Sequence, residues 1–249
     1  MINTIDYKKQ LYYEKRKYFG MSEDDGGIVG TIFGYIGSAI STYFFIAPVV
    51  PILKLIKGES SVKETPGILL ICSFLNCILW AMYGLLKDRF LQYAPNGLGG
   101  SITLIWITIY LIYLGDKKIH FALLYNILLI GCIIGLCILF YFVIDAELTG
   151  KIVLIFNVLM YAAPGEKMYT VCKTGNYKLI PIWSTIGGAA CSGCWLIYGI
   201  YVVDKYIIIP NALGIICSII QLVVYYIYKE KNVTPGGEQL TDDEPKEEE

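Results

Sequence analysis

The segment WAMYGLLKDRFLQYAPNGLGGSITLIWITIYLIY, residues 80–113, recurs 115 residues later as WLIYGIYVVDKYIIIPNALGIICSIIQLVVYYIY, residues 195–228. The two segments align without a gap and share 11 of 34 residues. Unrelated segments of this apolar composition would share about a tenth of their residues. The chain therefore contains two copies of one structural unit.

The repeat extends beyond the aligned segments. Pro66 matches Pro181 at the same shift, and Ala47-Pro48 matches Ala163-Pro164 at a shift of 116 residues. Residues 152–172 therefore take the place in the second copy that the first long apolar segment holds in the first copy.

The composition predicts a protein of the lipid bilayer. Of the 249 residues, 56% are apolar and 16% are charged, and the mean hydropathy is +0.58. A soluble domain has about 45–50% apolar and about 25% charged residues. The net charge of −1 offers no basic surface for nucleic acid, and the eight cysteines lie within apolar runs, which argues against a disulfide scaffold.

Uncharged windows between charged residues mark the transmembrane segments. Six windows hold 22 or more residues, enough to cross a hydrocarbon core of about 30 Å at about 1.5 Å per residue: 26–53, 65–86, 90–115, 119–144, 179–203 and 206–228. A seventh window, 152–165, is short by itself, but the repeat extends it to 152–172. The sequence predicts an all-α membrane protein with seven transmembrane helices.

These helices divide as three, one and three. We expect a polar N-terminal segment at 1–25, a first triple-helix repeat at 26–115, a linker helix at 116–145, a second triple-helix repeat at 146–228 and an acidic, disordered tail at 229–249. Four crossings separate equivalent points of the two repeats, so both insert into the membrane in the same orientation. Parallel repeats are typical of one class of secondary transporter.

Lysine and arginine counts predict the orientation, because cytoplasmic loops carry more of these residues. The loops after helices one, three and five hold eight, and those after helices two, four and six hold four. We therefore expect the N-terminus outside, the C-terminal tail in the cytosol, and the plasma membrane rather than an internal membrane. Five basic residues within 1–25 argue the other way, but three acidic residues separate them from the first span.

Seven short motifs follow one another along the chain: Ile46-Ala47-Pro48, Trp80-x-x-Tyr83-Gly84, Pro95-Asn96-Gly97, Tyr161-Ala-Ala-Pro164, Ile180-Pro181, Trp195-x-x-Tyr198-Gly199 and Pro210-Asn211. In this order and twice over, they resemble the SWEET family of sugar transporters. Relatives with Pro-Gln loops, some of which carry amino acids, have Gln after the proline of the second helix. Gly67 and Ile182 stand there in this chain.

The resemblance implies a set of site residues. The sugar-binding pairs would be Trp80, Trp195, Asn96 and Asn211, and further pocket positions would be Ser41, Phe44, Asn76, Asn157, Met160 and Cys191. The hinge prolines would be Pro48, Pro66, Pro164 and Pro181. An extracellular gate would combine Tyr83 and Asp204 with a basic residue. That residue would be Arg89, which lies one position away from the place where the family has its basic gate residue.

The chemistry of the paired residues agrees with this assignment. Trp80 lies seven residues before Lys87, and Asn96 lies seven residues after Arg89, so both are about 10 Å below one membrane boundary. A sugar needs an aromatic face for its C–H side and amides that donate and accept hydrogen bonds for its hydroxyls. In the alternative interpretation, the asparagines hold helices together and the tryptophans form an interfacial belt.

The six long windows contain no Asp, Glu, Lys or Arg. Ion coupling usually needs such an intramembrane group, so the leading hypothesis is a facilitative, bidirectional sugar uniporter that works by alternating access. Bulky residues at Phe44, Met160 and Asn76 favour a monosaccharide such as glucose. We expect no enzymatic activity, no cofactor and no metal, because Cys191 and Cys194 lack a nearby His or acid to complete a metal site.

Two other functions remain open at this stage. The first is a transporter of another small polar solute, such as an amino acid, although a zwitterion would favour a charged pocket residue. The second, less favoured, is a seven-helix receptor, whose helices would not be expected to repeat. The expected partners are the sugar and the lipid bilayer, and a homo-oligomer is compatible with the sequence.

Overall fold

A computed structural model describes residues 26–65, 67–114, 120, 123–131, 135 and 145–231. The predicted N-terminal segment 1–25, most of the linker helix 116–145, Pro66 and the tail from residue 232 lie outside the described residues.

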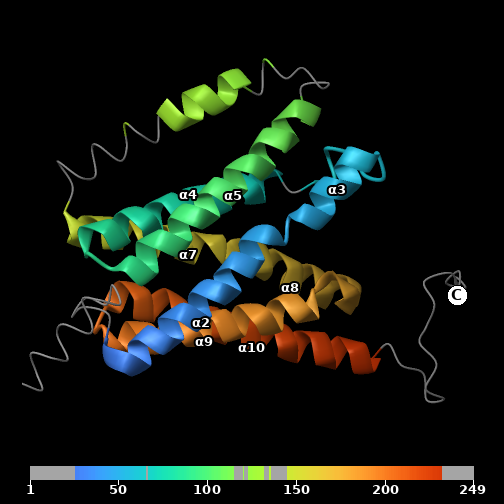
Figure 1. The fold of residues 1–249 in the computed structure, drawn as a ribbon. Helices are drawn as coiled ribbons and strands as arrows, with labels where there is room; N and C mark the ends of the chain where they lie inside the picture. Colours follow the sequence, from blue (N-terminus) through green and yellow to red (C-terminus); the bar gives the residue numbers. More distant parts are fainter. Residues whose placement is uncertain are drawn as a thin grey trace, which may run out of the picture.

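The described residues are almost entirely helical (Figure 1). The elements are α2 (Gly27–Ile46), α3 (Val49–Lys57), α4 (Gly67–Leu86), α5 (Phe90–Leu114), α7 (Ala146–Met160), α8 (Ala162–Thr174), the 3-10 turn η2 (Tyr177–Leu179), α9 (Ile182–Tyr201) and α10 (Lys205–Lys231). Residues 123–131 are also helical, and no strand occurs in these described ranges. The all-α class predicted from the sequence is confirmed.

Five stretches within the described ranges are long and apolar enough to cross a membrane: Gly27–Lys57, Gly67–Leu86, Phe90–Leu114, Ala146–Thr174 and Lys205–Lys231. Helix α9 has 20 residues, which span about 30 Å, but its Gly, Ser and Thr residues make it less apolar. Large apolar side chains cover the outer surface, among them Ile68 and Trp183 at 81% and 83% exposure. Such a surface suits contact with lipid.

Six helices of the described ranges close into a ring around the centre of the molecule. Its order, from helix packing, is α2, α9, α10, α7, α4, α5 and back to α2. In each half the third helix, α5 or α10, lies between the first and the second helix of that half. The two halves meet where α2 packs on α9 and where α4 packs on α7.

Equivalent helices of the two halves run in the same direction. Arg89, at the turn between α4 and α5, pairs with Asp204 at the turn between α9 and α10. Glu147, in the first turn of α7, bonds Lys205 at the start of α10, with 3.1 Å from Oε1 to Nζ. Helix α2 also begins at this end of the ring, since a Cβ on Gly26 would lie 2.8 Å from the Tyr201 Cβ. We call this end, on the left in Figure 1, the turn end.

The first helix of each half is broken near its motif proline. Helix α2 ends at Ile46, and Pro48 is the residue before α3. Helix α7 ends at Met160, and Pro164 lies in the first turn of α8. Proline has no amide hydrogen, and the first turn of a helix needs no acceptor for one. The two prolines are therefore accommodated by starting a new helix rather than by bending a continuous one.

Candidate functional site

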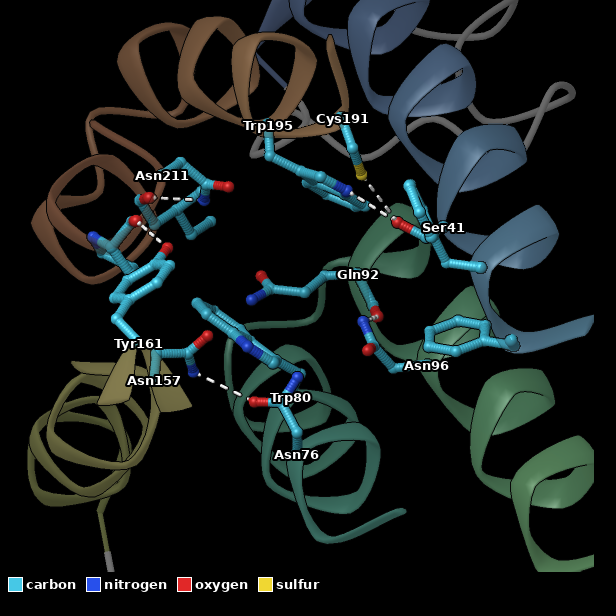
Figure 2. Close-up of a pocket in the computed structure, with 14 residues that line it drawn as sticks. Ser41, Asn76, Trp80, Gln92, Asn96, Asn157, Tyr161, Cys191, Trp195 and Asn211 are labelled. Carbon is cyan, nitrogen blue, oxygen red and sulfur yellow. Dashed lines mark hydrogen bonds between the residues drawn. The ribbon is translucent and has the colours of Figure 1, made fainter. Parts of the chain in front are cut away.

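A cavity of about 220 Å³ lies at the centre of the ring (Figure 2). All six ring helices contribute to its wall, which is lined by Ser41, Phe44, Phe45, Asn76, Trp80, Gln92, Asn96, Asn157, Tyr161, Cys191, Trp195, Ile207, Pro210 and Asn211. Nine of the ten predicted pocket residues are among them. We call this cavity the central pocket.

Met160, the tenth predicted residue, does not line the central pocket, and Tyr161 does so instead. Helix α7 ends at Met160, and the Tyr161 hydroxyl donates a hydrogen bond of 2.6 Å to the Pro210 carbonyl on α10. This bond holds the phenol ring against the pocket.

A polar bridge joins the two halves where α2 meets α9. Ser41 Oγ lies 3.3 Å from Cys191 Sγ, and the Trp195 indole N–H donates to the same Ser41 oxygen at 3.1 Å. These three side chains form one cluster on the wall in Figure 2.

A second polar bridge joins the halves where α4 meets α7. Asn157 Nδ2 donates to Asn76 Oδ1 at 3.0 Å. Asn157 is equivalent to Ser41 and Asn76 is equivalent to Cys191 under the repeat. The pocket is thus closed on opposite sides by symmetry-related contacts between different residue types.

The two motif asparagines have the same geometry in both halves. Asn96 Nδ2 donates to the Gln92 carbonyl at 2.8 Å, and Asn211 Nδ2 donates to the Ile207 carbonyl at 2.7 Å. Each bond uses one N–H of the amide and fixes the side-chain rotamer. Since both residues line the central pocket, the amide oxygen and the second N–H of each remain available there as acceptor and donor.

The two tryptophans are each supported by a buried tyrosine. Trp80 packs edge-to-face on Tyr83 with ring centroids 6.0 Å apart, and Trp195 packs in the same way on Tyr198 at 5.4 Å. Both tyrosines are fully buried. The indole rings are therefore held in place, half-buried, on two sides of the pocket (Figure 2).

Between the pocket and the turn end, the three predicted gate residues come together. The Tyr83 hydroxyl donates to Asp204 Oδ2 at 2.7 Å, and Arg89 forms an ion pair with the same oxygen. The Tyr206 backbone N–H donates to Asp204 Oδ1 at 2.9 Å. Arg89 and Asp204 are 7% and 5% exposed. We call Tyr83, Arg89 and Asp204 the gate cluster.

Helix-ending motifs position the two charged gate residues. The Arg89 N–H donates to the Gly84 carbonyl and the Asp204 N–H to the Gly199 carbonyl, both at 2.9 Å. These six-to-one bonds are typical of a Schellman motif, in which the preceding residue adopts a left-handed conformation. Asp88 (φ 49°) and Val203 (φ 52°) do so here. The repeat thus places a base and an acid at equivalent turns, facing each other.

The remaining predicted hinge residues lie at helix boundaries or outside the described ranges. Pro181 directly precedes α9, with φ −77° and ψ 87°. Pro66, its counterpart, falls outside the described residues. Motion at any of these prolines stays a prediction.

Five lining residues were not predicted from the sequence as pocket residues: Phe45, Gln92, Tyr161, Ile207 and Pro210. Gln92 and Ile207 each lie one helical turn before a motif asparagine and so share its helix face, which is a signal that was available. Tyr161 belongs to a quoted motif, although its side-chain bond to α10 has no sequence signature.

Acidic and sulfur side chains do not form a metal site in the part of the chain that the structure describes, because no three His, Cys, Asp or Glu residues gather there. The pocket instead offers aromatic faces, amides, a hydroxyl and a thiol. This set suits a neutral polar ligand with both apolar and hydroxyl-rich surfaces.

Known proteins resemble this chain over most of its length. A family model described as "Sugar efflux transporter for intercellular exchange" matches residues 31–118 and 147–233. The chain is 32% identical over 233 residues to the bidirectional sugar transporter SWEET5 of Arabidopsis thaliana, covering 84% of this chain and 95% of that one. It is 30% identical over 212 residues to the bidirectional sugar transporter SWEET1a of Sorghum bicolor, covering 82% and 78%.

A solved structure shares the fold. The structure of a eukaryotic SWEET transporter superimposes with a TM-score of 0.72 at 23% sequence identity, covering 84% of this chain and 100% of that chain.

Proposed function

The chain belongs to the SWEET family of sugar transporters, and we propose that it is a facilitative, bidirectional sugar uniporter that works by alternating access. The observation that carries this proposal is the central pocket, in which paired tryptophans and paired asparagines from two parallel halves face one cavity. Secondary transporters with parallel repeats bind substrate at the interface of the repeats.

The pocket fits the two kinds of surface that a sugar presents. The faces of Trp80 and Trp195 match the C–H side of a pyranose ring. The amides of Asn96, Asn211 and Asn76 supply donors and acceptors for hydroxyl groups.

The gate cluster supports alternating access. Tyr83 and Arg89 belong to the first half and Asp204 to the second, so the cluster holds the halves together at the turn end. A relative rotation of the halves that opens this end would separate Arg89 from Asp204. We assign the turn end to the outside of the membrane, as the lysine and arginine counts predict, which makes the described conformation closed to the outside.

The lack of charged side chains around the pocket in the described ranges favours passive transport. None of the residues lining the central pocket in the described ranges is Asp, Glu, Lys or Arg. A proton- or sodium-coupled carrier usually places an ionisable group near its substrate. The same feature argues against a zwitterionic amino acid, which would leave two charges without partners.

A monosaccharide such as glucose is the favoured substrate. The cavity of about 220 Å³ is smaller than the roughly 300 Å³ at the lower end of typical small-molecule sites. Phe44 reaches across from α2 to α9, because a Cβ on Gly187 would lie 3.1 Å from the tip of the Phe44 ring. The Asn76–Asn157 bridge closes the other side, so the two bridges leave little volume for a second sugar ring.

Uptake of radiolabelled glucose and sucrose into proteoliposomes that contain the purified full chain tests this proposal. We expect glucose uptake to stop at equal internal and external concentrations, with or without a pH gradient, and sucrose to enter more slowly. Accumulation above equilibrium that follows the pH gradient would refute uniport. Faster sucrose than glucose uptake would refute the size argument while leaving sugar transport intact.

A further inference from the structure

Gln92 differs from the other residues of the central pocket. It is 2% exposed, it lines the cavity, and its side-chain oxygen Oε1 is buried and has no hydrogen-bond partner among the described residues. Among the described residues that line the pocket, it alone has such an oxygen. A buried amide oxygen without a hydrogen-bond partner is unfavourable, and a donor group of a ligand would remove that cost.

The backbone of Gln92 is held on both sides. Its N–H donates to the Arg89 carbonyl at 3.0 Å, and its carbonyl accepts from Asn96 Nδ2 at 2.8 Å. Gln92 therefore lies between the gate cluster and a sugar-binding asparagine, on the first turns of α5. From there its side chain reaches toward the middle of the pocket, and in the view of Figure 2 its carboxamide lies between Trp80 and Trp195.

The repeat makes this position asymmetric. The residue equivalent to Gln92 is Ile207, 1% exposed, which lines the opposite part of the wall on α10. The tryptophans and the motif asparagines are identical in the two halves. At the position of Gln92 and Ile207, however, the first half presents an amide and the second half a hydrocarbon side chain.

We propose that Gln92 is a specificity-determining residue whose amide oxygen accepts a hydrogen bond from one hydroxyl of the bound sugar. The inference rests on the proposed function and adds to it the orientation of the sugar in the pocket. The sugar binds with a hydroxyl-bearing edge toward α5 and a less polar side toward Ile207, although the paired tryptophans and asparagines would accept either orientation.

Binding of glucose and its monodeoxy and monofluoro analogues to the purified full chain tests the assignment. The variant is Gln92→Met, which keeps length and helix propensity but removes the acceptor. We expect glucose to bind the variant about tenfold more weakly than the wild type, as for the loss of one partner of a desolvated hydroxyl. The deoxy and fluoro analogues altered at the contacted hydroxyl should bind both proteins equally, since neither analogue can donate there.

Controls separate this contact from a general structural effect. Thr103→Val removes the hydroxyl of a buried polar residue of α5 that bonds the Gly99 carbonyl and does not line the pocket, so it should retain the full discrimination between glucose and its analogues. Gln92→Leu repeats the test with a second side chain, and the melting temperature of each variant reports folding. We expect neither Gln92 variant to melt lower than the wild type, because the unpaired oxygen is removed.

Two results would overturn the inference while leaving the proposed function intact. One is an unchanged affinity for glucose in both Gln92 variants, and the other is an equal loss of affinity for glucose and for every analogue. Absence of glucose binding to the wild-type chain would overturn the proposed function, and this inference with it.

Discussion

At the scale of single residues, the Pro-Asn motif fixes the orientation of an amide that lines the central pocket. Proline at positions 95 and 210 removes a backbone donor inside α5 and α10. The asparagine that follows each proline bonds the carbonyl four residues earlier. The helix itself therefore orients the amide, and no neighbouring side chain is required to do so.

We predict that Asn96→Ala and Asn211→Ala each weaken sugar transport. Loss of an amide that contacts a desolvated hydroxyl costs about 1–3 kcal/mol, or roughly 5- to 150-fold in affinity. Uptake by each variant is compared with the wild type at equal expression. Thr103→Val is the matched control, because Thr103 is a buried polar residue of α5 that bonds Gly99 and does not line the pocket. Near-normal uptake in both asparagine variants would remove these residues from the site.

The sequence was most informative where the repeat marks a residue twice. Trp80, Asn96 and their partners were predictable because identical residues recur at one spacing. The repeat does not mark Gln92, because its counterpart is Ile207, and only its position one helical turn before Asn96 could have indicated it. Tyr161 was not predicted because its hydrogen bond to the Pro210 carbonyl depends on how α7 and α10 pack.

At the scale of helices, proline has different consequences in different tertiary surroundings. The break after α2 and the break after α7 lie close to the positions that the Ala-Pro matches indicated. Pro95, in contrast, remains inside α5, and the Leu91 carbonyl that it leaves without a helical donor lies 3.4 Å from Ser38 Oγ on α2. The same Ser38 hydroxyl lies closer to the Gly34 carbonyl of its own helix, at 2.7 Å, so its contact with Leu91 is the weaker of the two and depends on how α2 and α5 pack.

The left-handed residues before Arg89 and Asp204 carry different strain. Asp tolerates a left-handed conformation better than a β-branched residue does, for which it is a marked outlier. Val203 adopts φ 52° and is 86% exposed, so it has little packing to offset the strain. The turn that positions Asp204 is therefore less favourable than its counterpart at Asp88.

We predict that Val203→Gly raises the stability of the protein by up to about 1 kcal/mol, the relief of left-handed strain less the entropy of glycine. The melting temperature in detergent measures this change. Asp88→Gly is the matched control at the equivalent position of the first half, and we expect a smaller increase. Equal increases for both variants would contradict the proposed difference in strain.

At the scale of the whole molecule, the six-helix ring fixes which chain segments share one side of the membrane. The α4–α5 turn, the start of α7 and the α9–α10 turn all lie at the turn end. Cys172, in α8, is exposed toward the opposite end, where its carbonyl accepts from Tyr228 near the end of α10. Val203 and Cys172 therefore lie on opposite sides of the membrane and can be used to determine the orientation of the chain.

We predict that a membrane-impermeant maleimide labels Val203→Cys in intact cells and labels native Cys172 only after permeabilisation. The Val203→Cys change is made in a Cys172→Ser background, and Cys172→Ser without it measures labelling of the remaining cysteines. The reverse pattern would place the turn end in the cytosol and would make the described conformation closed to the inside.

The pseudo-symmetry of the halves also bears on the gate cluster. Arg89 and Asp204 are equivalent positions, 115 residues apart, and Tyr198 is the counterpart of Tyr83. An exchange of the two charges would move the carboxylate to position 89, where the symmetry-related tyrosine is Tyr198.

We predict that Arg89→Asp and Asp204→Arg each abolish transport, whereas the double variant recovers a measurable part of it. Each single change leaves two like charges at a buried site, and breaking a buried ion pair costs about 3–5 kcal/mol. The loss prevents the turn end from closing, so the cycle of alternating access stops. The double variant restores a pair of opposite charges between the same two turns. Uptake and melting temperature of all four proteins form a double-mutant cycle.

The tyrosines provide the discriminating control for this exchange. In the native arrangement the Asp204 carboxylate accepts from Tyr83, so Tyr83→Phe should weaken transport by the wild type more than Tyr198→Phe does. In the double variant the order should reverse, because the carboxylate then belongs to the other half. Additive losses in the charge cycle, or an unchanged order of the tyrosine effects, would show that the two charges do not act as a gate between symmetric halves.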